Sequence, residues 1–131
     1  MKICIVGGAG YIGSRLIPSL IEHHYEITVF DLFWFGDNLP EEIVKKKRDV
    51  FDIVESDLIG YDQVIFLAGL SNDPMAEFSP KDNFISNASA PSYLAYIAKK
   101  AGVKKYIYAD SCSVYGYTKN ELYDESSSVT C

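Results

Sequence analysis

The chain has 131 residues, enough for one domain with a hydrophobic core and too few for two. Its net charge of −6 argues against a general nucleic-acid binder, which would present a basic face, so we expect no nucleic-acid partner. No stretch is long and apolar enough to span a membrane, and we expect neither membrane association nor a signal peptide. The 3 cysteines lack metal-like or redox spacing, which favours a reducing cytoplasm.

Short apolar strand-like segments alternate with helical segments along the chain. In chain order we expect a strand at 2–6, a helix at 11–23, a strand at 26–30, an aromatic loop at 31–40, a weak strand at 43–50, a short helix at 52–58, a strand at 63–68, a long helix at 81–100 and a strand at 104–109. Strands that alternate with helices pair in parallel through right-handed crossovers. The pattern therefore predicts a single α/β domain over residues 1–131.

The third strand indicates the order of the sheet. Its KKKR run (45–48) is too charged for the buried middle of a parallel sheet, whereas lysine is common on an edge strand. The order 3-2-1-4-5 places this strand at the edge and leaves the apolar strands at 2–6 and 63–68 in the centre. The predicted fold is thus a Rossmann-type doubly wound parallel sheet with helices on both faces.

A glycine-rich turn joins the first strand to the first helix. The sequence IVGGAGYIGSRL (5–16) has glycines at positions 7, 8, 10 and 13, and it matches G-x-G-x-x-G from Gly8 onwards. Glycines allow a tight turn and let the backbone approach a pyrophosphate at the helix N-terminus. Asp31, at the end of the second strand, can accept hydrogen bonds from both hydroxyls of an adenosine ribose and would repel a 2′-phosphate. NAD is therefore favoured over NADP, although Arg15 near the turn could meet a phosphate; the alternative is a tight turn without a ligand.

Several separated motifs occur in a characteristic order along the chain. They are GGAGYIG (7–13), Asp31, Asp49-Val50, LAGLS (67–71), Asn87 and SCSVYG (111–116). With these motifs, the chain from Met1 to about Gly116 resembles the extended short-chain dehydrogenase/reductase family, that is, the NAD-dependent sugar-nucleotide epimerases and dehydratases. The resemblance implies NAD as the cofactor and a nucleotide-sugar substrate in the full-length enzyme, with transient hydride transfer to NAD.

The resemblance also implies roles for individual residues. The expected cofactor-binding residues are Gly7, Gly10, Tyr11, Ile12, Gly13, Asp31, Asp49, Val50, Leu67, Ala68, Gly69, Ser71 and Asn87. The glycine turn would hold the pyrophosphate, Asp31 the adenosine ribose, and Asp49-Val50 the adenine. The segment 67–69 would line the path to the nicotinamide ribose, with Ser71 near a phosphate and Asn87 stabilising the backbone beside the cofactor. No metal site is expected.

Four positions in or near this set have alternative interpretations. Asn87 could instead be an amide on a helix surface. Trp34 and Phe35 could shield the adenosine or simply pack against the protein. Cys112 is expected to be a small packed residue rather than a nucleophile.

Ser111 is the expected catalytic hydroxyl, which would hydrogen-bond the reacting sugar oxygen. In the family it acts with a Tyr-x-x-x-Lys pair, whose tyrosine is the acid/base. Tyr115/Lys119 follows Ser111 too closely to be this pair, and Tyr96/Lys100 lies on the helix before the fifth strand. The pair and the sugar-binding part are expected beyond the end of this chain, so the isolated chain is expected to be inactive.

The sequence therefore favours the NAD-binding part of a nucleotide-sugar epimerase or related oxidoreductase. The alternative is a non-catalytic dinucleotide-binding sensor or interaction module. Self-association is expected, through the helix at 81–100 or the fifth strand. The particular nucleotide sugar, the reaction among epimerisation, reduction and decarboxylation, and the choice between a fragment and a natural short form stay open.

Overall fold

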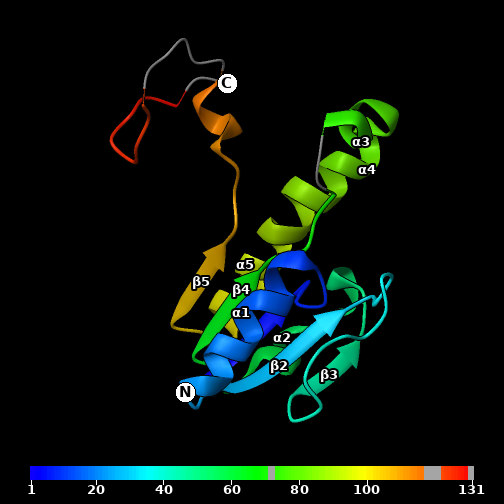
Figure 1. The fold of residues 1–131 in the computed structure, drawn as a ribbon, viewed down its shortest axis with the longest axis vertical. Helices are drawn as coiled ribbons and strands as arrows, with labels where there is room; N and C mark the ends of the chain where they lie inside the picture. Colours follow the sequence, from blue (N-terminus) through cyan, green and yellow to red (C-terminus); the bar gives the residue numbers. More distant parts are fainter. Residues whose placement is uncertain (71–72, 117–121, 130–131) are drawn as a thin grey trace.

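The computed structural model describes residues 1–70, 73–116 and 122–129. Within these residues, five parallel strands form one sheet in the order β3-β2-β1-β4-β5, which confirms the predicted fold (Figure 1). The strands are β1 (Lys2–Val6), β2 (Glu26–Asp31), β3 (Val44–Lys47), β4 (Gln63–Phe66) and β5 (Lys105–Tyr108). The connections diverge between β1 and β4, so the carboxyl ends of these two strands form the switch point of the sheet.

Helices cover both faces of the sheet. One face packs against α1 (Tyr11–Glu22), and the other packs against α2 (Glu55–Leu58) and α5 (Ala90–Lys100). In β1, Cys4 faces the side of α5, whereas Ile3 and Ile5 face the side of α1. Because both faces of the strand are buried, its sequence is a continuous apolar run instead of an alternating one.

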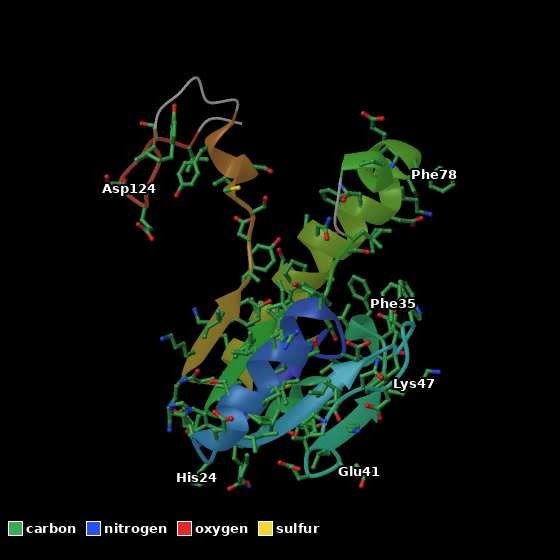
Figure 2. The ribbon with its side chains drawn as sticks, in the orientation of Figure 1. His24, Phe35, Glu41, Lys47, Phe78 and Asp124 are labelled. Atoms are coloured by element: carbon green, nitrogen blue, oxygen red, sulfur yellow. The ribbon has the colours of Figure 1, made fainter. Side chains whose placement is uncertain are left out.

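The lysines of the edge strand β3 have different surroundings. Lys45 donates to the carboxylate of Asp37 at 3.0 Å, and the ammonium of Lys46 lies 4.9 Å from the centroid of the Phe30 ring. Lys47 extends outward at the rim of the molecule (Figure 2). Each cation thus has a partner or solvent, which a central strand would not offer.

The predicted strand at 43–50 and the predicted helix at 52–58 are both shorter in the structure. β3 ends at Lys47, and a 3₁₀ turn, η1 (Val50–Asp52), follows before α2. The Asp49 carboxylate accepts the Phe51 N–H at 2.9 Å and caps this turn. Side-chain capping by aspartate competes with the strand ladder, and it ends the extended segment here.

The predicted helix at 81–100 is not a uniform α-helix. It consists of α4 (Pro80–Phe84), a π-helical turn η2 (Ile85–Ser89) and α5, and it follows a further helix α3 (Asp73–Phe78). π-helical turns inside α-helices occur frequently at functional sites. Figure 1 shows α3, α4 and the segment after β5 extending past the carboxyl ends of the strands. In the described part of the chain, no helix has the length and apolar character needed to cross a membrane.

Candidate functional site

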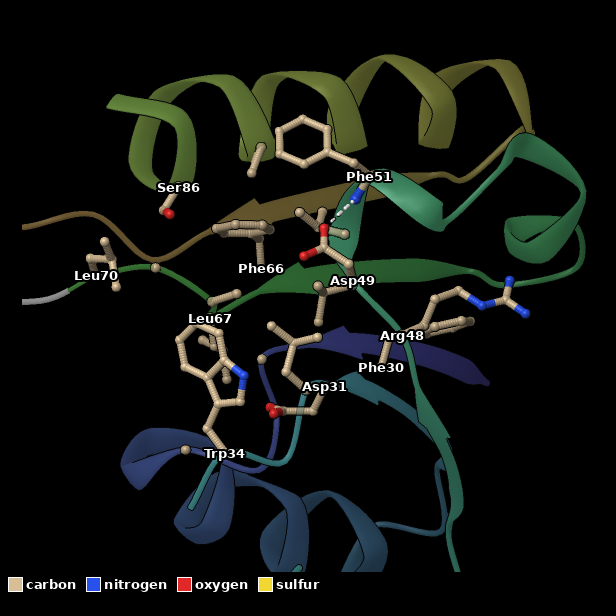
Figure 3. A pocket seen from close by; sticks show the side chains of 18 of the residues that line it. Phe30, Asp31, Trp34, Arg48, Asp49, Phe51, Phe66, Leu67, Leu70 and Ser86 are labelled. Atoms are coloured by element: carbon tan, nitrogen blue, oxygen red, sulfur yellow. Dashed lines mark hydrogen bonds between the residues drawn. The ribbon is translucent and has the colours of Figure 1, made fainter. Parts of the chain in front are cut away.

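Two adjoining cavities lie at the carboxyl ends of the central strands. The smaller cavity, of about 320 Å³, lies against the end of β2 and the segment after β3 (Figure 3). The larger cavity, of about 740 Å³, extends from the glycine turn to the segment after β5. Both are lined by Gly7, Gly10, Phe35 and residues 67–70. Together they form one groove across the switch point, the place where open α/β sheets bind ligands.

The glycine turn contains three glycines that packing within the protein requires and one that it does not. Gly7 has a φ of +81°, and a Cβ there would lie 2.5 Å from the Cα of Ala68. A Cβ at Gly8 would lie 2.9 Å from the nearest side-chain carbon, and a Cβ at Gly13 would collide with the carbonyl group of Gly8. At Gly10, by contrast, the nearest atom to a Cβ is the Gly7 oxygen at 3.6 Å, an ordinary contact. A turn without a ligand therefore explains Gly7, Gly8 and Gly13, whereas Gly10, which lines both cavities, fits close approach of a ligand.

The N-terminus of α1 points its backbone donors at the groove. The first intrahelical N–H is that of Ser14, which donates to the Gly10 carbonyl at 3.0 Å. The preceding N–H groups of Tyr11, Ile12 and Gly13 have no helical partner, and all three residues line the larger cavity. The first turn of α1 carries no acidic side chain. These donors and the positive end of the helix dipole suit a pyrophosphate.

Asp31 lies on the wall of the smaller cavity and connects two loops. Its Oδ2 accepts the Ala9 N–H at 2.9 Å, and its Oδ1 accepts the Phe33 N–H at 2.7 Å. Each carboxylate oxygen keeps a second lone pair, which can accept a ribose hydroxyl. The carboxylate thus ties the glycine turn to the aromatic loop as well as facing the cavity, a structural role that sequence reasoning missed.

The rest of the smaller cavity is mostly apolar. Val50 and Phe51 line it from η1, and Phe66 lines it from the end of β4 (Figure 3). Phe51 is itself supported by Tyr93, with ring centroids 5.7 Å apart. Asp49 lines the cavity too, although its carboxylate is occupied in capping η1. An apolar wall with a carboxylate at Asp31 suits a planar base attached to a sugar.

Asn87, in the π-helical turn, holds the backbone after β4. Its Oδ1 accepts the Leu70 N–H at 3.0 Å, and its Nδ2 donates to the Leu70 carbonyl at 2.8 Å and to Asn83 Oδ1 at 2.6 Å. Gly69 has a φ of +151°, and a Cβ there would lie 2.5 Å from Asn87 Oδ1. The interpretation of Asn87 as a surface amide is therefore wrong: its amide is a clamp on the segment that separates the two cavities.

Ser111 lies on the wall of the larger cavity, together with Tyr108 and Asp110. The Ser111 hydroxyl is 3.0 Å from that of Ser113, and it accepts the Ser113 N–H at 3.2 Å. Tyr108 donates to the Asn87 carbonyl at 3.1 Å, and burial, together with the Asp110 charge, raises the pKa of its phenol. The Tyr108 hydroxyl is thus engaged with the Asn87 carbonyl and not with Ser111.

Some predicted residues lie outside the groove or outside the described residues. Tyr96 and Lys100 line neither cavity; the ammonium of Lys100 lies 5.0 Å from the centroid of the Tyr96 ring. Ser71 and Lys119 fall outside the described residues. The expectation that Cys112 packs is wrong, because its side chain is exposed. Within the described residues, no group of three His, Cys, Asp or Glu side chains is arranged for a metal ion.

Sequence reasoning missed several residues that line the groove, among them Leu70, Ile85, Ser86 and Tyr108. Leu70 and Tyr108 follow or end the same strands as residues that were named, so their positions at the strand ends could have indicated them. Ile85 and Ser86 carried no such signal, because a π-helical turn changes which residues of a helix face the sheet.

A family model matches nearly the whole chain. Residues 3–130 match the model of the NAD dependent epimerase/dehydratase family. The chain belongs to this family. It is 28% identical over 120 residues to UDP-glucose 4-epimerase from Corynebacterium glutamicum, covering 88% of this chain and 36% of that protein. It is 30% identical over 130 residues to UDP-glucuronic acid decarboxylase 1 from Danio rerio, covering 93% of this chain and 31% of that protein.

Among solved structures, the chain resembles UDP-N-acetylglucosamine 4-epimerase from Methanobrevibacter ruminantium M1 in complex with UDP-N-acetylmuramic acid. The TM-score is 0.89 at 29% sequence identity, and the match covers 98% of this chain and 44% of that one. The chain thus spans about a third of the length of the curated relatives above, 36% and 31%. The family is NAD-dependent, so NAD is its cofactor, and the Gly10 position, the free donors of α1 and the Asp31 carboxylate fit a dinucleotide.

Proposed function

We propose that the chain is the NAD-binding part of an enzyme that epimerises a nucleotide sugar, or carries out a related oxidation and reduction on one. The observation that carries this proposal is the position of Ser111. Its hydroxyl lines the same cavity as the free donors of α1 and the Asn87 clamp, at the end of the groove away from Asp31. A hydroxyl at that end is placed to meet an oxygen of a substrate beside the nicotinamide.

The groove residues have distinct tasks in this proposal. The N–H groups at the start of α1 bind the pyrophosphate, and the lone pairs of Asp31 accept the adenosine ribose hydroxyls. Val50 and Phe51 provide the apolar wall for adenine, while Asn87 keeps the Leu70 segment in place. When bound, NAD supplies a hydride acceptor. Ser111 orients the sugar oxygen by a hydrogen bond.

The acid/base for this reaction is proposed to lie outside the described groove. Of the residues beside Ser111, Tyr108 donates to the Asn87 carbonyl at 3.1 Å and Asp110 accepts the Ser111 N–H at 2.8 Å. The isolated chain is therefore predicted to bind NAD without turnover. Relatives named UDP-glucose 4-epimerase and UDP-glucuronic acid decarboxylase 1 make a UDP-sugar the first substrate class to test. A location in the cytoplasm stays a prediction from the cysteine usage.

Activity of the full gene product that carries this chain tests the proposal. With NAD and a panel of UDP-sugars, we expect an epimerised, reduced or decarboxylated product by chromatography. Ser111→Ala should lower the turnover by about 100-fold or more, with NAD affinity unchanged. Ser19→Ala, an exposed serine of α1 outside the groove, is the matched control and should leave turnover intact.

A non-catalytic dinucleotide sensor is the second candidate, because the Tyr-x-x-x-Lys pair within the described residues, Tyr96/Lys100, lines neither cavity. The two candidates differ in the same assay. NAD binding without turnover of any nucleotide sugar by the full gene product would favour the sensor. Failure to bind NAD would contradict both.

A further inference from the structure

The aromatic loop after β2 presents two large side chains to solvent beside the smaller cavity. Trp34 is 71% exposed and Phe35 is 85% exposed. Both line the smaller cavity, and Phe35 also lines the larger one. Figure 3 shows the Trp34 indole near Asp31 and Leu67, across the cavity from Phe51. Two exposed aromatic rings at the rim of an apolar cavity are arranged for a ligand that covers them.

The residues on either side of these two rings are held by contacts with the rest of the protein. The exposure of the two rings is therefore not shared by the whole loop. The Phe33 N–H donates to Asp31 Oδ1 at 2.7 Å, and the Phe33 side chain packs on the core beside α1. Phe33 has a φ of +54°, a left-handed conformation that non-glycine residues seldom adopt. On the other side, Leu39 is only 6% exposed. The chain thus half-buries Phe33, buries Leu39 and turns Trp34 and Phe35 outward between them.

Asp31 connects this loop to the proposed position of the adenosine. The same carboxylate that faces the cavity holds the loop through the Phe33 N–H and the glycine turn through the Ala9 N–H. A base joined to a ribose at Asp31 therefore lies within the reach of Trp34, three residues further along. Indole is the largest aromatic surface available for stacking on a purine.

We propose that Trp34 binds the adenine of NAD by stacking over the smaller cavity, opposite the wall formed by Val50 and Phe51. Phe35, which lines both cavities, covers the junction where the ligand crosses from one to the other. This inference rests on the NAD binding proposed above and adds the residue that stacks on the adenine base. It also explains why an otherwise costly exposed indole is placed next to Asp31.

The test uses the adenine-containing and adenine-free parts of the cofactor separately. Trp34 is the 1 tryptophan of the chain, so its fluorescence reports this position alone. Titration with NAD or ADP-ribose should change its emission, whereas nicotinamide mononucleotide should not. By calorimetry, Trp34→Ala should weaken NAD and ADP-ribose binding about tenfold and leave mononucleotide binding unchanged. Trp34→Phe should retain most of the affinity.

Phe78→Ala is the matched control. Phe78 is as exposed as Phe35, at 85%, but it lies on α3 and lines neither cavity (Figure 2). Its removal should leave all three affinities unchanged. The inference is overturned if the parent chain binds NAD and Trp34→Ala, with an unchanged melting temperature, binds ADP-ribose as tightly as the parent. A parent chain that binds neither NAD nor ADP-ribose overturns the proposed function as well, so the two failures are distinct.

Discussion

Replacing Asn87 with alanine removes the clamp on the segment between the two cavities. The variant loses the bond from the Leu70 N–H, at 3.0 Å, the bond to the Leu70 carbonyl, at 2.8 Å, and the bond to Asn83, at 2.6 Å. A neutral hydrogen bond contributes a net stabilisation of about 1 kcal/mol, so the loss of the two Leu70 bonds alone should lower the free energy of unfolding by about 2 kcal/mol. For a domain of this size, that loss corresponds to a drop in melting temperature of about 7 °C.

The same change should weaken NAD binding. Without the clamp, the backbone at Gly69 and Leu70 must be ordered when the ligand binds. Ordering a residue costs about 1–2 kcal/mol, so we expect the affinity for NAD to fall by about tenfold. Differential scanning calorimetry measures the first effect, and isothermal titration calorimetry on the folded variant measures the second.

Asn83→Ala is the control for this experiment. It removes the 2.6 Å bond between Asn87 Nδ2 and Asn83 but keeps both bonds to Leu70. We expect less than half the loss in melting temperature and an unchanged NAD affinity. An Asn87→Ala variant that melts within about 1 °C of the parent would refute the clamp. A lower melting temperature with unchanged NAD affinity would limit the clamp to stability.

Four further predictions concern other parts of the chain. Gly69→Ala should destabilise the fold by about 2 kcal/mol, because its Cβ would conflict with the Asn87 side chain. The double variant with Asn87→Ala should lose less stability than the sum of the two single variants, and strictly additive losses would contradict this conflict. Asp31→Ala should weaken NAD binding about tenfold, and it should lower the melting temperature because two backbone N–H groups lose their acceptor. Equal affinity of the parent chain for NAD and NADP in calorimetry would contradict the assignment of Asp31 to the adenosine ribose. The hydrogen bond from Lys104 lowers the pKa of Asp62 below its usual 3.8, so the ionised carboxylate stabilises the fold fully above pH 3.8 and loses this effect as the pH falls through the lower folded pKa. Asp62→Asn should therefore reduce the fall in melting temperature at acid pH, and an unchanged dependence of melting temperature on pH would argue against the Asp62–Lys104 pair. Sedimentation at micromolar concentration should show a dimer or larger species, and a monomer would exclude the predicted self-association.

Local patterns in the sequence determined most of the fold. The continuous apolar runs of β1 and β4 mark strands buried on both faces, and the lysines of β3 mark an edge. Composition thus placed these three strands, and the doubly wound topology supplied the rest of the order. The boundaries of the helices and strands could not be predicted from these patterns. β3 ends where Asp49 caps a turn, and the helix from 81 to 100 contains a π-helical turn, because side-chain bonds and tertiary contacts override the periodic pattern there.

Some features of the candidate site could also be predicted from the sequence, and others could not. The spacing of the glycines and the position of Asp31 at a strand end were sufficient to predict a dinucleotide groove, since the turn and the helix N-terminus are formed by neighbouring residues. Only the tertiary structure decided that Asp31 also bonds Ala9, 22 residues away, and that Asn87 clamps Leu70, 17 residues away. Asp31 meets Ala9 because β1 pairs with β2, and Asn87 meets Leu70 because the helical segment that contains Asn87 packs against β4. No local pattern encodes such contacts.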